Sequence, residues 1–579
     1  MAETNSSRKV KCVTQLDPRL ECMEYAQKDE RWGIFKGCEG SNYVQQQSNS
    51  YSTSGVVWNF NTQSENSIMD RRMYARVQFQ CTLVGKAPVG QPLLSSENDA
   101  PRAFPLASVT NNLSVVINGK SINTQYNSAL QALLRYNLDE SCHELDLSGT
   151  PNSLDKAQRY QDLVGSVRNP LSTYANNSYE TGRGAFNVDS ITNPVGVGTG
   201  AGDASVTAVV LFTVTEPLII SPMLFKSSDL QAGLIGVRNF GVNFSFSGNL
   251  DRVWSHAGGN NVTLSSVTTQ IGSGTTAPPQ LLVNYLSPPQ SDITQIPKKV
   301  NYQYYETDTQ VNDQNVTLAP NASQSFTNNS IQLARIPKAI YVYASVPQGS
   351  KTYLSSDTFF RINSFTLNYL NVSGQFSSMS INDLYNMSVK NGCNMSFQEW
   401  SGLTFDYTSS SRYGLTGSVL KIGVSDLHIP SNLASGMNMN SQLSYTIGIQ
   451  NINQVDSLEV SLTTVLIYEG LMSIENGSMV TNVGVIDQKD VMETRANLSD
   501  FIPYSFSQNL YGGNLFENIG HFFTAPYRAY KTGKEAVEKG KQAYKTAMDL
   551  KKMIGLGDGG ALVGGQQMSR RQLKELMFE

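Results

Sequence analysis

The two halves of this chain carry the same kinds of segment in the same order, roughly 210 to 250 residues apart. Each half has two short strands, a helix, a strand that ends in an acidic residue and a proline turn, and a further strand. These segments are residues 111–123, 129–138, 206–225 and 239–250, and then residues 360–374, 381–392, 417–437 and 440–452. The repeated order favours duplication of one domain within the chain. Coincidence among β-rich segments is the alternative.

Most of these segments alternate apolar and polar residues, which is the pattern of half-buried strands. Residues 73–85, MYARVQFQCTLVG, are the clearest example, and residues 56–63 follow the same rule. Asn118-Gly119 predicts a tight turn between two strands, and residues 460–474 predict a last strand pair. Only 16% of the residues are charged, against about 25% in typical soluble domains. Polar, weakly charged, turn-rich sequence of this kind predicts many strands joined by long loops.

We therefore predict an all-β fold of two tandem antiparallel sandwiches, with the long interstrand loops that are typical of jelly rolls. The predicted parts are an N-terminal arm (1–55), a first jelly roll (56–285), a linker (286–300), a second jelly roll (301–504) and a helical basic tail (505–579). The polar start, MAETNSSRKVKC, lacks the apolar stretch of a secretion signal, and no apolar run is long enough to span a bilayer. Both features predict a soluble protein that is made in the cytosol.

Motifs that carry catalytic or metal chemistry are missing, so we predict no catalytic, cofactor-binding or metal-binding residues. The four histidines have no zinc spacing and are interpreted as structural or surface residues: His143, His256, His428 and His521. The six cysteines have no metal spacing and are interpreted mainly as buried thiols: Cys12, Cys22, Cys38, Cys81, Cys142 and Cys393. Gly85-Lys86 is followed by Ala87, which cannot supply the hydroxyl of a phosphate-binding loop.

Two acidic segments are the nearest approach to a cation site. They are residues 139–146, DESCHELD, and a segment that offers Glu306, Asp308 and Asp313. Neither matches a known cation-binding loop, so solvated loops are the simpler interpretation. Trp58 and Trp254 are expected to anchor the core of the first sandwich rather than to form a sugar-stacking platform.

The tail is electrostatically separate from the rest of the chain. From His521 onward, eleven basic residues oppose six acidic ones, a surplus of five positive charges, which leaves about −9 on the remainder of a chain of net charge −4. The basic residues are Arg528, Lys531, Lys534, Lys539, Lys541, Lys545, Lys551, Lys552, Arg570, Arg571 and Lys574. A stripe of small residues at heptad spacing also predicts a helix here: Ala529, Gly533, Ala536, Gly540, Ala543 and Ala547.

Three interpretations of the tail remain open. Its helix could pack on its own domain or on a neighbouring subunit. Its basic residues could face inward and touch packaged nucleic acid or an inner membrane. It could also be a removable assembly segment. The Gly-rich joint at residues 555–567 favours a tail that finds its partner during assembly.

Several of these segments resemble the double jelly-roll major capsid proteins of DNA viruses, the lineage of adenovirus hexon, virophage and polinton- or adintovirus-like proteins. The resemblance lies in DRRMYARVQFQCTLVG (70–85), NGKSIN (118–123), RGAFN (183–187), VTEPLIISPM (214–223), DRVWS (251–255) and TFFRINSFTLNYLNVSG (358–374). It implies homotrimeric, pseudo-hexameric capsomers that tile an icosahedral shell around the genome. The implied location is the virion, and the implied partners are the chain itself and penton or minor capsid proteins.

The predicted function is therefore that of a major capsid protein and not of an enzyme. The first alternative is a receptor- or carbohydrate-binding β-sandwich spike or fibre protein of a virion, which would need exposed aromatic platforms. The second is a β-sandwich hydrolase with paired carboxylates.

Overall fold

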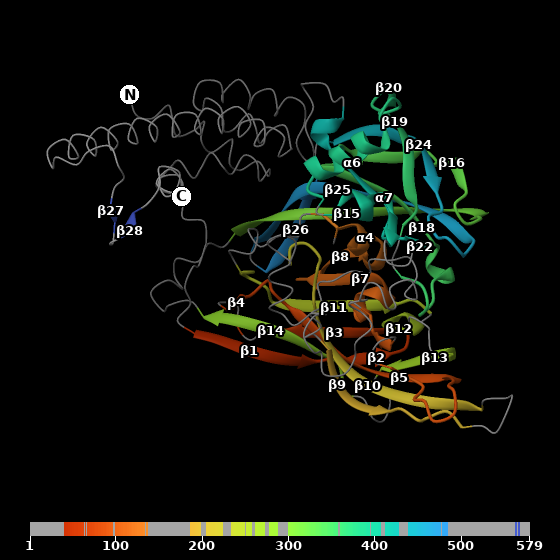
Figure 1. Ribbon diagram of the computed structural model, residues 1–579. Coiled ribbons are helices and arrows are strands. Elements are labelled where there is room, and N and C mark those ends of the chain that lie inside the picture. The colour runs from red at the N-terminus through yellow and green to blue at the C-terminus, as the bar shows by residue number, and fades with distance from the viewer. Residues whose placement is uncertain are drawn as a thin grey trace, which may run out of the picture. The chain divides into compact units, whose positions relative to one another are not determined.

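The computed structural model describes residues 40–136, 186–287 and 299–483, with short gaps, and four residues near the C-terminus (Figure 1). The gaps are residues 63, 65–66, 96–98, 103, 134, 198–203, 224–232, 249, 257–260, 272–276, 357–358, 394, 407–410, 428–437 and 476. The chain forms two compact units, Met1–Gly513 and Asn514–Glu579. In the second unit, β27 (Leu562–Val563) pairs with β28 (Gln566–Gln567).

The first unit begins with a sandwich of two antiparallel sheets. One sheet runs in the order β1 (Gly40–Gln47), β14 (Gln280–Ser287), β5 (Tyr74–Lys86), β10 (Ser205–Pro217) and β9 (Phe186–Thr192), with β13 (Thr263–Ile271) also on β5 and β4 (Ile68–Met69) on β14. The other runs in the order β2 (Ser50–Ser52), β3 (Gly55–Asn61), β11 (Asn239–Phe246), β7 (Thr110–Ile117) and β8 (Lys120–Gln125). Antiparallel sheets with one buried face need the alternating sequences seen above.

A second sandwich follows in the same unit. Its first sheet runs in the order β15 (Lys299–Leu318), β25 (Leu458–Glu475), β18 (Ala339–Ser345) and β23 (Val419–Gly423), with β26 (Ser478–Val483) on β25. Its other sheet runs in the order β16 (Ser323–Thr327), β24 (Asn438–Gln450), β19 (Arg361–Tyr369) and β20 (Val372–Gln375), with β17 (Ile331–Arg335) on β24.

Both sandwiches wind in the same way. The main strands, in chain order, are β1, β3, β5, β7, β8, β10, β11 and β14, and then β15, β16, β18, β19, β20, β23, β24 and β25. In each set, one sheet holds strands one, eight, three and six, and the facing sheet holds strands two, seven, four and five. This is the jelly-roll topology. The predicted all-β double jelly roll is confirmed, and the shared topology supports the predicted duplication.

The two sandwiches differ at the eighth strand. In the first, β13 pairs with β5 from Phe79 to Lys86 and β14 pairs with it only from Tyr74 to Arg76. In the second, β25 is one strand of 18 residues. The prediction of a strand pair at residues 460–474 is therefore wrong, because the apolar stretch there stays in one strand that lies between β15 and β18.

Side-chain alternation accounts for the cores. On β5, Ala75, Val77, Phe79, Cys81 and Leu83 are fully buried and the residues between them are partly exposed. Trp58 and Trp254 are at most 1% exposed, as predicted, and Trp400 is equally buried in the second sandwich. The turn at Asn118-Gly119 is also confirmed, since both residues have the positive φ angles that a type I′ hairpin requires.

Two of the predicted boundaries differ from the structure. The sequence predicts an arm up to residue 55, but residues 40–47 form β1 and residues 50–52 form β2. Both are edge strands whose side chains are mostly exposed, so their sequences lack an apolar alternation. The predicted helix at residues 129–138 is α4, which spans Tyr126–Leu133. The helix after β20 is confirmed as α6 (Ile381–Lys390), which begins with a capping box at Ser380 and Asp383.

Candidate functional site: the junction of the two sandwiches

The described residues offer no constellation for chemistry. They hold no group of three His, Cys, Asp or Glu side chains that could bind a metal ion. Glu306, Asp308 and Asp313 lie on strand β15, so the interpretation of this segment as a solvated loop is wrong. Glu306 forms an ion pair with Arg335, with Oε2 and Nη1 2.6 Å apart. No described helix is long and apolar enough to cross a membrane.

The two described cysteines, Cys81 and Cys393, are free and buried, as predicted. Burial raises the pKa of the Cys81 thiol to about 12, so this thiol is not a nucleophile near neutral pH. The other four cysteines, residues 139–146 and all eleven basic residues of the predicted tail lie outside the described residues. The expectations for them stay predictions.

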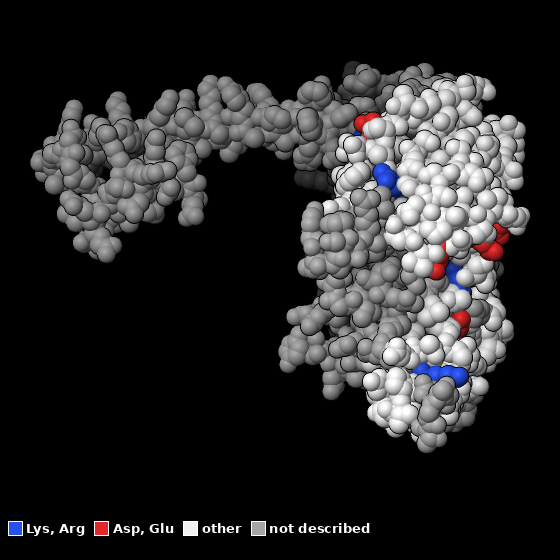
Figure 2. Space-filling model, turned by 45° about the vertical axis from the view of Figure 1, so that its right-hand side comes forward, with Lys and Arg blue, Asp and Glu red and all other residues white. Residues whose placement is uncertain are grey.

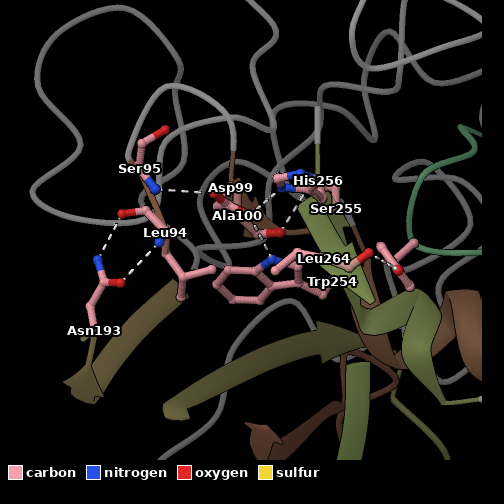
Figure 3. Close-up of polar contacts among 10 residues, drawn as sticks. Leu94, Ser95, Asp99, Ala100, Asn193, Trp254, Ser255, His256 and Leu264 are labelled. Atoms are coloured by element: carbon pink, nitrogen blue, oxygen red, sulfur yellow. Dashed lines mark hydrogen bonds and ion pairs between the residues drawn. The ribbon is translucent and has the colours of Figure 1, made fainter. Parts of the chain in front are cut away.

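His256 and Asp99 form the buried pair that most resembles a catalytic arrangement (Figure 3). His256 Nδ1 lies 2.7 Å from Asp99 Oδ1, and both side chains are at most 3% exposed. Trp254 Nε1 also donates to Asp99 Oδ1, at 3.3 Å, and Ser95 N donates to Asp99 Oδ2 at 3.0 Å. The neighbouring Ser255 Oγ donates to the backbone oxygen of Ala100. The pair therefore fastens β6 (Asp99–Pro101) to β12 (Trp254–His256).

The same segment joins the first sandwich to the second. Arg252, on the turn η4 (Asp251–Val253), is 1% exposed, and its Nη1 donates to Thr352 O at 3.2 Å and to Ser355 Oγ at 3.1 Å. His256 N donates to Tyr353 O at 3.1 Å, and Tyr353 Oη donates to Leu264 O at 2.9 Å. Each sandwich therefore donates hydrogen bonds to backbone oxygens of the other.

Tyrosines reinforce the junction elsewhere. Tyr302 Oη, from β15, accepts from Ile235 N at 2.8 Å and donates to Gly233 O at 3.1 Å. Tyr343 Oη, from β18, donates to Ser128 O at 2.9 Å, and Tyr136 Oη donates to Val419 O. Because each hydroxyl is satisfied where the ring is buried, these tyrosines act as both packing and polar anchors.

The hydrophobic cores also overlap. Tyr302, Tyr304, Met472 and Ile474, from the second sandwich, pack in the core of the first. In the other direction, Ala129, Ala132 and Tyr136 pack in the core of the second. The Arg135 guanidinium lies 4.3 Å from the ring centroid of Phe359, which adds a cation–π contact across the junction. The two sandwiches are therefore joined by shared cores.

Sequence reasoning missed this junction. Its residues are scattered over short connections such as residues 251–256 and 352–355, and a sequence does not show which strands meet across domains. The one available signal was the tyrosine cluster at Tyr302, Tyr304 and Tyr305.

Glu216 should make the stability of the first sandwich depend on pH. Both of its carboxylate oxygens accept from backbone N–H groups, those of Leu106 and Ala107 at the start of α3 (Pro105–Val109). Burial nevertheless raises the pKa of Glu216 from 4.5 to about 8. Since the folded state then holds more protons than the unfolded state between these values, this group's contribution to stability falls as pH rises from about 4.5 to 8.

Thermal unfolding of Glu216→Gln tests this expectation. The difference in Tm between variant and unmodified chain should move in favour of the variant as pH rises from about 5 to 8. A difference that stays constant over that range would show that Glu216 does not titrate there.

The comparisons with known proteins agree with the double fold. The family described as "Sputnik virophage major capsid protein 1st domain" matches residues 11–286, and the family described as "Major capsid protein V20 C-terminal domain" matches residues 304–470. The first match ends within β14 and the second begins within β15. Putative capsid protein V20 of Sputnik virophage is 25% identical over 610 residues, 99% of each chain.

Solved structures give the same result. The chain resembles a protein in the 3.5 Å cryo-EM structure of the Sputnik virophage, with a TM-score of 0.70 and 26% identity over 84% of this chain and 97% of the other. The mavirus major capsid protein has the same fold, with a TM-score of 0.62 and 17% identity over 80% of this chain and 94% of the other.

Proposed function

Since the chain belongs to the double jelly-roll major capsid proteins of DNA viruses, we propose that three copies associate into a capsomer with a pseudo-hexagonal outline. The protein is a major capsid protein and a structural component of the virion, not an enzyme, and it assembles with itself into the capsid lattice. The observation that carries the trimer proposal is the repeated jelly roll with a shared core. Three such chains supply six similar sandwiches, enough for a six-cornered ring.

The surface chemistry suits this role. Figure 2 shows that the described part of one face carries only scattered Lys, Arg, Asp and Glu among uncharged residues. Burying a charged side chain costs free energy unless it is paired, so a sparsely charged surface can be covered by other copies at lower cost. We expect each trimer contact to exceed the roughly 2,000 Å² typical of obligate interfaces.

The mass of the purified chain in solution tests the proposal. We expect a species near 190 kDa, three times 63.4 kDa, by light scattering after size exclusion. A monomer that persists at high protein concentration would contradict the trimer. The comparisons do not favour the alternative of a receptor- or carbohydrate-binding spike.

For the tail at residues 505–579 we propose contact with packaged nucleic acid or an inner membrane through its basic residues. The supporting observation is its excess of positive charge, since from His521 onward the basic residues outnumber the acidic ones by five on a chain that is otherwise acidic. We also propose that penton and minor capsid proteins are further partners of this chain, and that the chain is synthesised in the host cytosol.

Deletion of residues 515–579 should leave trimers intact and impair shell closure or genome retention. Normal filled particles from the truncated chain would contradict the tail's role.

A further inference from the structure

The first sandwich carries an exposed apolar patch at the end of β5 and β9. Val89, Val195 and Val197 are 61%, 47% and 54% exposed, and we define them as the valine patch. Ile191, near the end of β9, is a further exposed apolar residue, with 40% of its surface accessible. Single exposed apolar residues are ordinary, but several on one small scaffold mark an interaction surface.

The scaffold beneath the patch is tightly hydrogen-bonded. Val89 bridges to Gly196, and Pro92 bridges to Val195. Gly196 N donates to Gln91 O at 2.8 Å, and Gly90 N donates to Gly196 O at 3.1 Å. These hydrogen bonds hold residues 87–94 against residues 193–197.

Two further features fix the geometry. The side chain of Asn193 bonds twice to the backbone of Leu94, with Leu94 N to Oδ1 at 2.9 Å and Nδ2 to Leu94 O at 2.7 Å (Figure 3). At Gly196, an added Cβ would lie 2.1 Å from Ala87 O, so only glycine permits this approach. The valines are therefore held in place before any partner binds, which lowers the entropic cost of binding.

Charge and sheet topology together indicate what kind of molecule covers the valine patch. Residues 87–94 and 191–197 contain no charged residue, so the valine patch offers nothing to a polyanion such as nucleic acid or to an anionic lipid surface. It complements a weakly charged protein surface, and a chain with only 16% charged residues presents such a surface. β9, which runs into the patch, is the last strand of its sheet, and its outer edge pairs with no described strand. A second protein chain can therefore lie along the valine patch and the outer edge of β9.

We propose that the valine patch is a contact between copies of this chain, covered by a second copy when the protein self-associates. This inference rests on the proposed self-assembling function, and it assigns one of its surfaces. The contact is heterologous in a three-fold ring, so the patch meets a different surface of the next copy.

A triple variant, Val89→Ser, Val195→Ser and Val197→Ser, tests the contact. The matched control is Val372→Ser, Val455→Ser and Val480→Ser, which changes three exposed valines of the second sandwich. In a dilution series followed by sedimentation velocity, the concentration of half-dissociation should rise at least tenfold for the patch variant. It should change less than threefold for the control.

A single cysteine provides a second readout that does not depend on stability. With Val195→Cys, maleimide labelling should be at least tenfold slower in the associated form than in the dissociated form, after subtraction of labelling in the unmodified chain. If the unmodified chain never associates, the proposed function and this inference both fail. If it associates while Cys labelling at position 195 stays fast and the triple variant associates normally, the inference alone is overturned, even where another protein binds the patch.

Discussion

Replacing Trp254 by alanine is expected to lower the free energy of unfolding of the first sandwich by about 3–5 kcal/mol, the range for truncating a large buried aromatic residue. Trp254 is fully buried, its ring centroid lies 6.2 Å from that of Phe212, and its Nε1 donates to the buried carboxylate of Asp99. The truncation removes the ring, leaves a cavity and takes one donor from Asp99. Chemical denaturation followed by circular dichroism measures the loss.

Two controls separate these contributions. Trp254→Phe keeps most of the ring and removes only the N–H donor, so its cost should be clearly smaller. Tyr43→Ala removes an aromatic ring that is 77% exposed and should change stability by no more than about 0.5 kcal/mol. A loss below about 1 kcal/mol for Trp254→Ala would show that this tryptophan does not anchor the core.

Replacing Arg252 by methionine is expected to weaken the coupling between the two sandwiches. Methionine keeps an apolar stem of similar length but removes the guanidinium that donates to Thr352 and Ser355. Hydrogen bonds from a charged donor contribute roughly 1.5–3 kcal/mol each, and the oxygens of Thr352 and Ser355 would lose the guanidinium as one of their donors. Since the change lies between the cores, calorimetry should show one broadened or split transition where the unmodified chain shows a single one.

Arg72→Met is the matched control for this experiment. Arg72 is about half exposed, and its Nε lies 3.5 Å from Asp70 Oδ1 within the first sandwich. An exposed ion pair of this kind contributes at most about 1 kcal/mol, so the control should leave the transition almost unchanged. If Arg252→Met behaves like the control, the cation does not couple the sandwiches.

The sequence predicts the strands well where one face of a sheet is buried. β5 and the β7–β8 hairpin follow directly from period-two alternation and from Asn118-Gly119. The predicted duplication rests on the same signal, since strands four to seven of each sandwich follow one another in the same order. β1 escaped prediction because it is an edge strand of Gly, Ser, Asn and Gln with an exposed tyrosine, and of its described side chains only Val44 is an apolar one packed against the core.

The candidate site was much less accessible to sequence reasoning. Arg252 and Tyr353 meet only because two distant connections come together in the fold, and neither has a local motif. The acidic residues of β15 resemble those of a solvated loop in the sequence, because their ion-pair partners, such as Arg335, come from another strand. The valines of the patch are isolated in Pro- and Gly-rich segments whose exposure depends on hydrogen bonds between residues 87–94 and 193–197.

The split eighth strand of the first sandwich has a geometrical consequence. Because β13 and β14 stand where the second sandwich has the unbroken β25, the two halves of a chain are not interchangeable. Three chains around an axis would form a hexagon whose vertices alternate between two types. A neighbouring hexagon turned by one vertex would then present the other type of vertex, so the chain itself would determine how each proposed trimer is rotated relative to its neighbours.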